Sequence, residues 1–444
     1  MILILGAGLA GLSTAYHLVK DYVVFEREER PGGLCRTRQA GGFHFDYTGH
    51  LLHLRNDYTK QLITELLPDA FATWSRSAWI FSHGVYTPYP FQANTFGLPP
   101  EVIKECLMGY FEAREAWIKS ADDGARTAAD PEESFEHWVL RVFGRGYARH
   151  FMFPYNEKLW QTKAADMTAD WVSWSVPRPE PEEVINGALG LNNRAFGYNP
   201  TFMYPVQGGI ELLPKALASQ VSGIQKNKEA MRIDPVRRTV HFSDGTTEHY
   251  DSLVSTLPLK ELFKIIEGVP DALADAVCKL SCTSLLDINI GIAREGAGDG
   301  RHWFYIPEPE FPFYRVGFSS NFSRSVAPAG TSTMYIEVAH MPENPLDHQQ
   351  TLEIVLKDFV KSGMLTPDDN VIATDIVDIP YAYVVYDRHR QKVLPEAFSW
   401  LESLSIFSVG RYGAWIYGSM EDAILQGKEV AEKIQRVQLR QARQ

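Results

Sequence analysis

The chain has 444 residues, more than one hydrophobic core usually serves, so we expect two or three regions that each bury their own apolar side chains. The formal net charge is -12, and the sequence shows no basic stripe that could follow the phosphates of a nucleic acid. No signal-peptide pattern is found, and no stretch approaches the roughly 18 apolar residues of a membrane span. We therefore expect a cytoplasmic protein that neither binds nucleic acid nor spans a membrane.

The cysteines are few and scattered along the chain. Cys35, Cys106, Cys278 and Cys282 form no CxxC pair, and none stands beside histidines at metal-ligand spacing. We expect reduced thiols and no metal site.

The chain opens with the pattern of a strand, a glycine turn, a helix and a second strand. The apolar run Ile2–Leu5 precedes the turn at residues 6–11, residues 12–19 are predicted to be helical, and Tyr22–Phe25 is predicted to be a strand. This is half of a nucleotide-binding unit.

The glycine turn carries the spacing GxGxxG at Gly6, Gly8 and Gly11. Such glycines allow a tight turn, a close approach of backbone to a pyrophosphate and close packing of helix on strand. Glu26 ends the second strand about 20 residues further on, where a carboxylate can accept hydrogen bonds from both ribose hydroxyls. The combination predicts a dinucleotide cradle.

Two further segments extend this cradle. In the first, Gly33 and Leu34 offer backbone amides to the phosphates, and Arg36 offers a cation. The second is a strand and turn that would bring Gly49 and His50 to the reactive ring of the cofactor.

The rest of the chain alternates between helical and extended patterns. Residues 101–153 are helical and rich in aromatic side chains, and an amphipathic helix at residues 134–143 could start at Pro131. The later elements are a helix at residues 209–219, a hairpin and buried strand at 240–255, an antiparallel sheet at 287–338, a strand from Ile406 and a long helix from near Met420.

These segments resemble the FAD superfamily of amine oxidases, protoporphyrinogen oxidases and UDP-galactopyranose mutases. The segment with Gly410, Arg411 and Met420 is similar to the last FAD contact of that superfamily, at the pyrimidine edge of the flavin. The resemblance implies non-covalently bound FAD and NAD(P)H as its reductant.

The implied fold class is α/β, or α+β overall. It combines a Rossmann-like FAD-binding domain, assembled from discontinuous segments, with a helical insertion and an antiparallel substrate domain. The expected divisions are an FAD-binding domain at 1–88, 204–262 and 400–444, a mainly helical substrate or cap domain at 89–203, and an antiparallel sheet domain at 263–399.

Several later motifs are similar to the eukaryotic type of UDP-galactopyranose mutase. By this resemblance Tyr89 and Gln92 hold the uracil of the substrate and Phe151 stacks on it, with Asn156 and Trp160 in the same motif. An aromatic face and an amide are what a pyrimidine pocket requires. Core packing is the other interpretation of these aromatic residues.

The resemblance also places contacts around the sugar and diphosphate. Asn199 would contact the sugar nucleotide, Arg315 would clamp the pyrophosphate, and Tyr383 and Tyr417 would lie near it. A guanidinium suits this role because its planar fork gives paired hydrogen bonds and keeps its charge.

The catalytic residues implied by the resemblance are Gly49, His50 and Arg315. The Gly49 carbonyl would accept a hydrogen bond from N5 of the reduced flavin, and His50 would lie under the ring. One position departs from the family: Ser175 stands where a second diphosphate arginine is usual, with Arg178 and Arg194 the nearest substitutes.

The implied reaction interconverts the pyranose and furanose forms of an NDP-sugar, with UDP as the expected nucleotide, through a sugar adduct at N5 of reduced FAD. A flavin oxidase or desaturase of the protoporphyrinogen or amine oxidase type is the alternative. A flavoprotein that binds a nucleotide sugar without turnover is a third hypothesis. The sequence fixes neither the sugar nor the oligomeric state.

Overall fold

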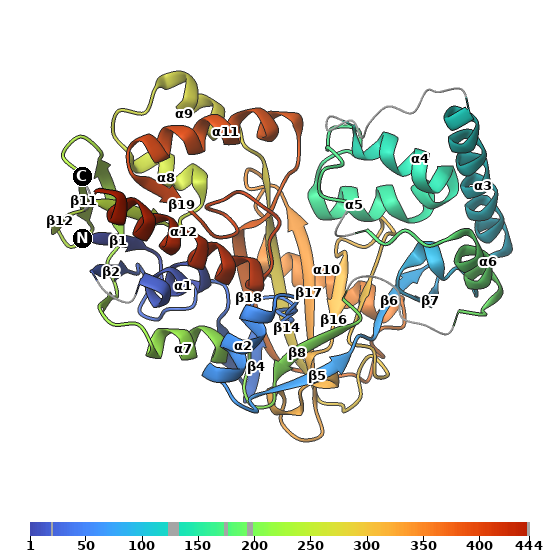
Figure 1. Cartoon of the computed structure of the whole chain (residues 1–444). Helices are drawn as coiled ribbons and strands as arrows, with labels where there is room; N and C mark the ends of the chain where they lie inside the picture. The colour runs from blue at the N-terminus through green and yellow to red at the C-terminus, as the bar shows by residue number, and fades with distance from the viewer. Residues whose placement is uncertain (19–20, 123–132, 173–175, 193–198, 442–444) are drawn as a thin grey trace.

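The structure is a computed structural model that describes residues 1–18, 21–122, 133–172, 176–192 and 199–441. Figure 1 shows three parts side by side. Both chain ends lie in the part with a parallel sheet and its helices, a mainly antiparallel sheet occupies the centre, and a group of helices lies on the far side of that sheet. The cavity described below is lined by residues of all three parts.

The nucleotide-binding part is built on a five-stranded parallel sheet. Strand β1 pairs with β2 on one side and with β13 on the other, so its four apolar residues are buried. From edge to edge the strands are β19 (Ile406–Ser408), β13 (Ser252–Ser255), β1 (Ile2–Leu5), β2 (Tyr22–Phe25) and β9 (Ile224–Gln225). The two strands predicted at the start of the chain are confirmed.

Helix α1 (Leu9–Leu18) begins three residues earlier than the sequence pattern predicted. The third glycine of the motif therefore lies inside the first turns of the helix. A Cβ on Gly11 would lie only 2.0 Å from the carbonyl oxygen of Gly6, so the helix can pack this closely on the glycine turn only without a side chain there.

Helices cover both faces of the parallel sheet. Helix α1 packs on α12, which begins at the predicted Met420, and on α7 (Leu212–Ser219), which starts inside the predicted range 209–219. Helix α12 spans Met420–Gln441, and the other helices of this part are α2 (Asp57–Leu66), α8 (Leu259–Ile265), α9 (Asp271–Cys278) and α11 (Arg388–Ser403). The predicted hairpin is confirmed within a small antiparallel sheet of β10 (Ala230–Asp234), β11 (Thr239–Phe242) and β12 (Thr247–His249).

The central sheet has seven strands and confirms the predicted antiparallel region. Strands β14 and β17 are longer than the short runs predicted, and every residue of both is buried because both faces of the sheet are covered. In order the strands are β18 (Val371–Val384), β14 (Cys282–Ile292), β17 (Ser332–His340), β16 (Arg315–Gly317), β15 (Trp303–Tyr305), β6 (Ala78–Ser82) and β7 (Val85–Pro88).

Two of these strands come from a distant part of the chain. Strands β6 and β7 lie inside the segment 1–88 that the sequence assigned to FAD binding, yet β6 pairs with β15 in the central sheet. The sheets therefore do not divide at residue 88. The remaining strands form two pairs, β3 (Thr37–Ala40) with β4 (Phe43–Asp46) and β5 (Phe71–Ser75) with β8 (Thr201–Pro205).

One face of the central sheet is apolar and the other carries polar groups. In β14, Leu286, Ile288 and Ile290 pack in one hydrophobic cluster with Val355 and Phe359 of helix α10 (His348–Lys361). Because successive residues of a strand point to opposite faces, Asp287 lies on the face turned away from α10.

The helical part contains the predicted amphipathic helix. Helix α4 begins after Ser134, whose hydroxyl accepts the N–H of His137 at 3.2 Å, while the predicted start at Pro131 lies outside the described residues. The helices here are α3 (Pro100–Asp122), α4 (Phe135–Tyr147), a π-helical turn (Ala148–Met152), α5 (Phe153–Trp160) and α6 (Pro181–Leu189).

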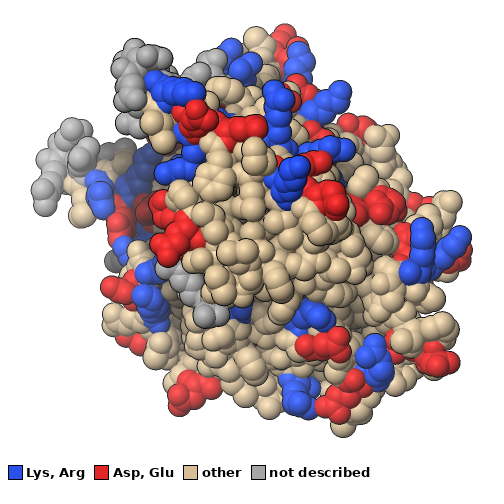
Figure 2. All heavy atoms as spheres, turned by 90° about the vertical axis from the view of Figure 1, so that its right-hand side faces the viewer, with Lys and Arg blue, Asp and Glu red and all other residues tan. Residues whose placement is uncertain are grey.

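The outer face of the helical part mixes apolar and charged side chains. Figure 2 shows a broad uncharged area with Lys, Arg, Asp and Glu interspersed around it. Exposed apolar residues on α3 and α6 include Met108, Phe111, Ile118, Ile185 and Leu189. The described residues of this face present no continuous surface of one charge.

Candidate active site

A cavity of about 1630 Å³ connects the parallel sheet, the central sheet and the helical part. Pockets for a single ligand usually measure roughly 300–1,000 Å³. The cavity therefore has room for a dinucleotide and for a second ligand beside it.

The predicted site residues come together in this cavity, with one exception. Gly11 does not line it, because it packs helix α1 against the glycine turn. The predicted residues that line the cavity are Gly6, Gly8, Glu26, Gly33, Leu34, Arg36, Gly49, His50, Tyr89, Gln92, Phe151, Asn156, Trp160, Asn199, Arg315, Tyr383, Gly410, Arg411, Tyr417 and Met420.

The glycine turn and the second glycine segment lie in direct backbone contact. Gly33 has a φ of +58°, and a Cβ there would lie 3.3 Å from Cα of Gly8. The carboxylate of Glu26 accepts the N–H of Ala7 at 2.8 Å and the N–H of Glu28 at 2.9 Å, which fixes it at the end of β2. This is a narrow, side-chain-free groove with a carboxylate at one end, as an adenosine diphosphate requires.

Arg36 brings a cation to the same groove. Its guanidinium lies 4.0 Å from Glu26 and 3.7 Å from Glu28, and its buried Nε has no hydrogen-bond partner in the protein. Buried polar atoms are normally paired, so an unpaired guanidinium nitrogen beside a groove fits a phosphate ligand.

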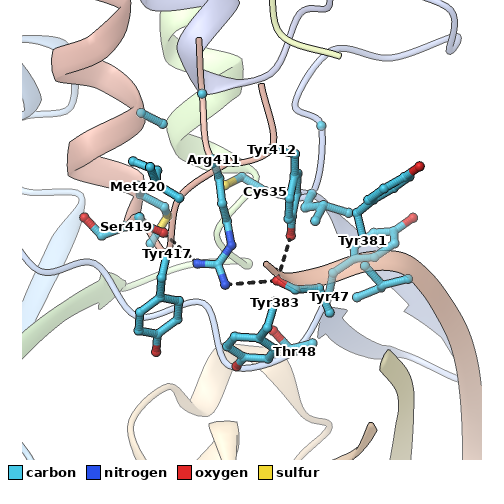
Figure 3. Close-up of a pocket in the computed structure, with 18 of the residues that line it drawn as sticks. Cys35, Tyr47, Thr48, Tyr381, Tyr383, Arg411, Tyr412, Tyr417, Ser419 and Met420 are labelled. Carbon is cyan, nitrogen blue, oxygen red and sulfur yellow. Dashed lines mark hydrogen bonds between the residues drawn. The ribbon is translucent and has the colours of Figure 1, made fainter. Parts of the chain in front are cut away.

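The C-terminal segment closes the other end of the cradle. Arg411 donates to the carbonyl of Gly418 at 2.6 Å and to the carbonyl of Ala382 at 3.0 Å, so it ties the turn before α12 to the end of β18. Figure 3 shows its guanidinium above the rings of Tyr383 and Tyr417. These two rings lie 5.6 Å apart, so one arginine positions both tyrosines.

The loop after β4 lies directly against the polar face of the central sheet. A Cβ on Gly49 would lie 2.5 Å from the hydroxyl of Tyr335 and 2.8 Å from Nη2 of Arg315, so any larger residue would require one of these side chains to move. The N–H of Thr48 donates to Asp287 at 3.0 Å. The loop therefore contacts side chains of β14, β16 and β17.

His50 is an uncharged group at neutral pH. Burial lowers the pKa of its imidazole to about 4, and the nearby cations of Arg411 and Arg315 act in the same direction. It can therefore contact a flavin without adding a positive charge.

Arg315 is held by an acid and by aromatic rings. It lies 3.4 Å from Glu337, which is directly opposite in the ladder of β16 and β17. Its guanidinium lies 5.3 Å from the ring of Trp303 and 5.4 Å from that of Tyr335. These contacts fix the planar fork beside the loop of Gly49.

The residues predicted to bind the uracil of the substrate lie among aromatic side chains, apart from the glycine groove of the cradle. Gln92 donates to the carbonyl of Pro177 at 2.6 Å, which leaves its buried Oε1 without a partner in the protein. Phe151 stacks on Phe91 and on Tyr155, with ring centroids 5.1 and 5.2 Å apart. Tyr155 also lines the cavity, and the sequence had not singled it out.

The two remaining residues of this motif make their contacts within the protein. Asn156 donates to the carbonyl of Met152 at 2.7 Å. Trp160 lies edge-on to Tyr383 and to Tyr417, at centroid distances of 5.6 and 5.8 Å. Helix α5 is therefore packed directly against the tyrosine pair.

Of the two proposed substitutes for the second diphosphate arginine, the structure describes only Arg178, which does not line the cavity. Ser175 and Arg194 lie outside the described residues. Arg178 is exposed, and its guanidinium lies 5.1 Å from the ring of Trp138 on α4. Arg76 lines the cavity instead, with its guanidinium 4.9 Å from the ring of Tyr89.

Sequence reasoning missed the polar residues of the central sheet. Asp287 and Glu337 are completely buried, and Tyr335 precedes Glu337 by two residues on the same face of β17. The available signal was an acidic residue inside an otherwise apolar strand, as in LLDINI and MYIEVAH. Such residues are rare in buried strands unless they serve a site.

The described residues offer no metal site and no membrane-spanning helix. No cluster of His, Cys, Asp and Glu in the described ranges could hold a metal ion. Among the helices that the structure describes, none has the length and apolar character that crossing a bilayer requires. All four cysteines are free thiols.

The parallel sheet, its glycine turn and the carboxylate at the end of β2 define a dinucleotide-binding flavoprotein. The chain belongs to the family of flavin-containing amine oxidoreductases, whose sequence model matches residues 9–435. The predicted superfamily and the predicted fold class are both confirmed, and the cradle fits FAD.

Solved structures show a similar fold over nearly the whole chain. A reduced UDP-galactopyranose mutase is 29% identical, with a TM-score of 0.90 over 98% of this chain and 94% of that chain. A putative protoporphyrinogen oxidase from Exiguobacterium sp. 255-15 is 15% identical, with a TM-score of 0.72 over 98% of both chains. A fatty acid isomerase from P. acnes is 14% identical, with a TM-score of 0.67 over 97% of this chain and 98% of that chain. The last two share the fold alone.

Proposed function

We propose that this chain is an FAD-dependent mutase that interconverts the pyranose and furanose forms of a nucleoside-diphosphate sugar. UDP is the expected nucleotide and NAD(P)H the expected reductant of the flavin. The similarity to the reduced UDP-galactopyranose mutase supports this choice within the family. The observation that carries it is the fixed guanidinium of Arg315, which lies against the loop of Gly49 inside the cavity of the FAD cradle.

That arrangement suits a reaction in which a diphosphate leaves and returns beside the flavin. When bound, reduced FAD supplies the nucleophilic nitrogen N5, which can take up the sugar at its anomeric carbon without net oxidation. Arg315 would hold the diphosphate through paired hydrogen bonds and stabilise its charge as it leaves. Because Glu337 and the surrounding rings already fix Arg315, little reorganisation is needed.

The other residues of the cavity have roles that follow from their positions. The Gly49 carbonyl would accept a hydrogen bond from N5–H, while the neutral His50 leaves the charge on Arg315 for the diphosphate. Tyr383 and Tyr417, positioned by Arg411, would donate hydroxyl hydrogen bonds to the same group.

The aromatic group around Gln92 would bind the base. A uracil ring can lie on an aromatic face and pair its edge with a side-chain amide. Tyr155 and Tyr89 line this end of the cavity, and the buried Oε1 of Gln92 is an acceptor that lacks a protein partner.

The decisive experiment is a panel of nucleotide sugars with the dithionite-reduced and the oxidised holoenzyme. Conversion of a UDP-sugar to its furanose form only after reduction is expected. Oxygen uptake with oxidised enzyme and no sugar isomerisation would favour the oxidase alternative. If UDP neither perturbs the flavin spectrum nor raises the unfolding temperature, the mutase proposal is wrong.

A matched pair of arginine variants tests the role of Arg315. Arg315→Lys removes the planar fork and should weaken UDP-sugar binding about 10- to 150-fold, since a charged hydrogen bond is worth roughly 1.5–3 kcal/mol. Arg294 also pairs with an acid, Asp369 at 2.5 Å, but does not line the cavity. Arg294→Lys should leave binding unchanged.

A further inference from the structure

Two buried acids lie opposite each other in the central sheet, next to the loop of Gly49. Asp287 of β14 and Glu337 of β17 are directly opposed in the antiparallel ladder, and both have 0% exposure. Arg315 of β16 is directly opposed to Glu337 on the other side. Two acids and one cation therefore lie in one row across three neighbouring strands, and directly opposed like charges are destabilising.

Each acid has one oxygen that no hydrogen bond satisfies. Asp287 accepts from the N–H of Thr48 at 3.0 Å and from the amide of Asn289 at 2.7 Å, both through Oδ2, while its buried Oδ1 has no partner. Glu337 uses Oε1 for Arg315, while its buried Oε2 has no partner. Two directly opposed carboxylates in a dry sheet repel each other, so the row favours a proton on one of the two acids.

The surroundings favour a proton on Asp287. Burial raises the pKa of Asp287 to about 8, and the charges of Glu337 and Asp375 act in the same direction, while the N–H of Thr48 and the amide of Asn289 oppose them. Asp375 on β18 is itself paired with Arg38 of β3 at 2.8 Å.

The other titratable groups near the pair are phenols and one cation. Tyr335 on β17 has a buried hydroxyl without a partner, and the phenol of Tyr314 before β16 lies beside Glu337. Burial raises the pKa of each phenol. Both stay neutral in the ordinary pH range. Arg315 is the cation directly opposite Glu337, so one proton on Asp287 leaves one acid for one cation.

We propose that Asp287 is a positioning residue of the flavin site that carries a proton at neutral pH. Through Thr48 it fixes the adjacent Gly49 against the cofactor, and by remaining neutral it leaves Glu337 as the sole negative partner of Arg315 in this row. Loss of the proton places a second negative charge beside that pair. The position of the loop of Gly49 and the position of the Arg315 guanidinium, which would hold the diphosphate, then change together.

The effect on the flavin spectrum requires FAD in the cradle but no sugar, so it can fail or succeed independently of the mutase reaction, whereas the effect on UDP affinity rests on the proposed function. The assay is a pH titration of the visible spectrum of the oxidised holoenzyme from pH 6 to 9.5, with UDP affinity measured at both ends. The wild type should show a spectral transition near pH 8 and bind UDP several-fold more weakly above it.

Three variants separate the proposal from a merely structural role. Asp287→Asn keeps the shape and cannot ionise, so it should retain the low-pH spectrum and lose the transition. Asp287→Ala removes the acceptor of Thr48 and should change the spectrum at every pH. Asp369→Asn alters an acid that lies outside the cavity and should keep the wild-type transition.

A fourth variant covers the case in which Asp287 variants do not fold. Glu337→Gln removes the opposing charge and should move the transition down by about one pH unit. The proposal is overturned if Asp287→Asn keeps the transition, if its low-pH spectrum matches that of the alanine variant, or if Glu337→Gln leaves the transition in place.

Discussion

Replacement of Gly49 by alanine should disrupt the site by a defined contact. The new Cβ would lie 2.5 Å from the hydroxyl oxygen of Tyr335 and 2.8 Å from Nη2 of Arg315, well inside the ordinary contact distance. Overpacking of this size costs roughly 1–3 kcal/mol in a buried region. If the strain is relieved by displacing Arg315, the affinity for UDP should fall about 5- to 150-fold.

A second substitution checks that this contact is the cause. Tyr335→Phe deletes the nearest atom, a hydroxyl oxygen with no hydrogen-bond partner to lose, and leaves the ring carbon Cζ at 2.8 Å from the new Cβ. The double variant Gly49→Ala/Tyr335→Phe should therefore regain part of the lost binding free energy, while Tyr335→Phe alone stays close to wild type. UDP titration followed by the flavin spectrum measures both. The reasoning is refuted if the alanine variant binds UDP normally, or if phenylalanine restores nothing.

Three further substitutions test the stability of the fold and its hold on FAD. The pKa of Asp287 rises from its ordinary value of 3.8 to about 8 in the folded state, so between these pH values only the folded protein keeps the proton. The unfolding free energy contributed by this residue should therefore fall by about 1.4 kcal/mol per pH unit as pH rises through that window. Urea unfolding of Asp287→Asn should lack this slope, and an identical slope would contradict the assignment. Gly11→Ala places a Cβ 2.0 Å from the carbonyl oxygen of Gly6, which should distort the glycine turn of the cradle. The purified variant should therefore lose most of its FAD on gel filtration, and full FAD occupancy would disprove the close packing. Lys158 donates to three backbone carbonyls, including that of Phe313 at 3.2 Å. Lys158→Met should therefore lower the free energy of unfolding by about 2–4 kcal/mol in a thermal unfolding experiment, and Lys158→Arg should restore part of it. Lys104→Met, on the exposed side of α3, should have no effect.

The cradle could be predicted because its requirements are local in sequence. A turn that approaches a pyrophosphate needs glycines at fixed spacing, and the ribose carboxylate must end the next strand, so Gly6 to Glu26 are recognisable without a structure. The start of helix α1 was placed three residues late because the third glycine looks like part of the turn.

The substrate end could not be predicted in the same way. Arg315, Tyr383 and Tyr417 were found through family resemblance, since nothing in their local sequence brings them together. Asp287 and Glu337 were missed because their meeting depends on a strand register that joins residues 50 positions apart. Arg76 was missed for the same reason: β6 crosses from the N-terminal segment into the central sheet just after it.

The position of β13 between β1 and β19 has a consequence for biosynthesis. The sheet that carries the cradle draws on residues 2–5, 252–255 and 406–408, and helix α12 packs on α1. A ribosome releases Gly6 to Gly11 long before it adds Gly410 and Met420. Strand β1 can pair with β2 early, but β19 can join β13 and helix α12 can pack on α1 only after the segment from Ile406 has been made. The cofactor can therefore enter a finished site only after this segment has left the ribosome, and truncations that remove it should accumulate without FAD.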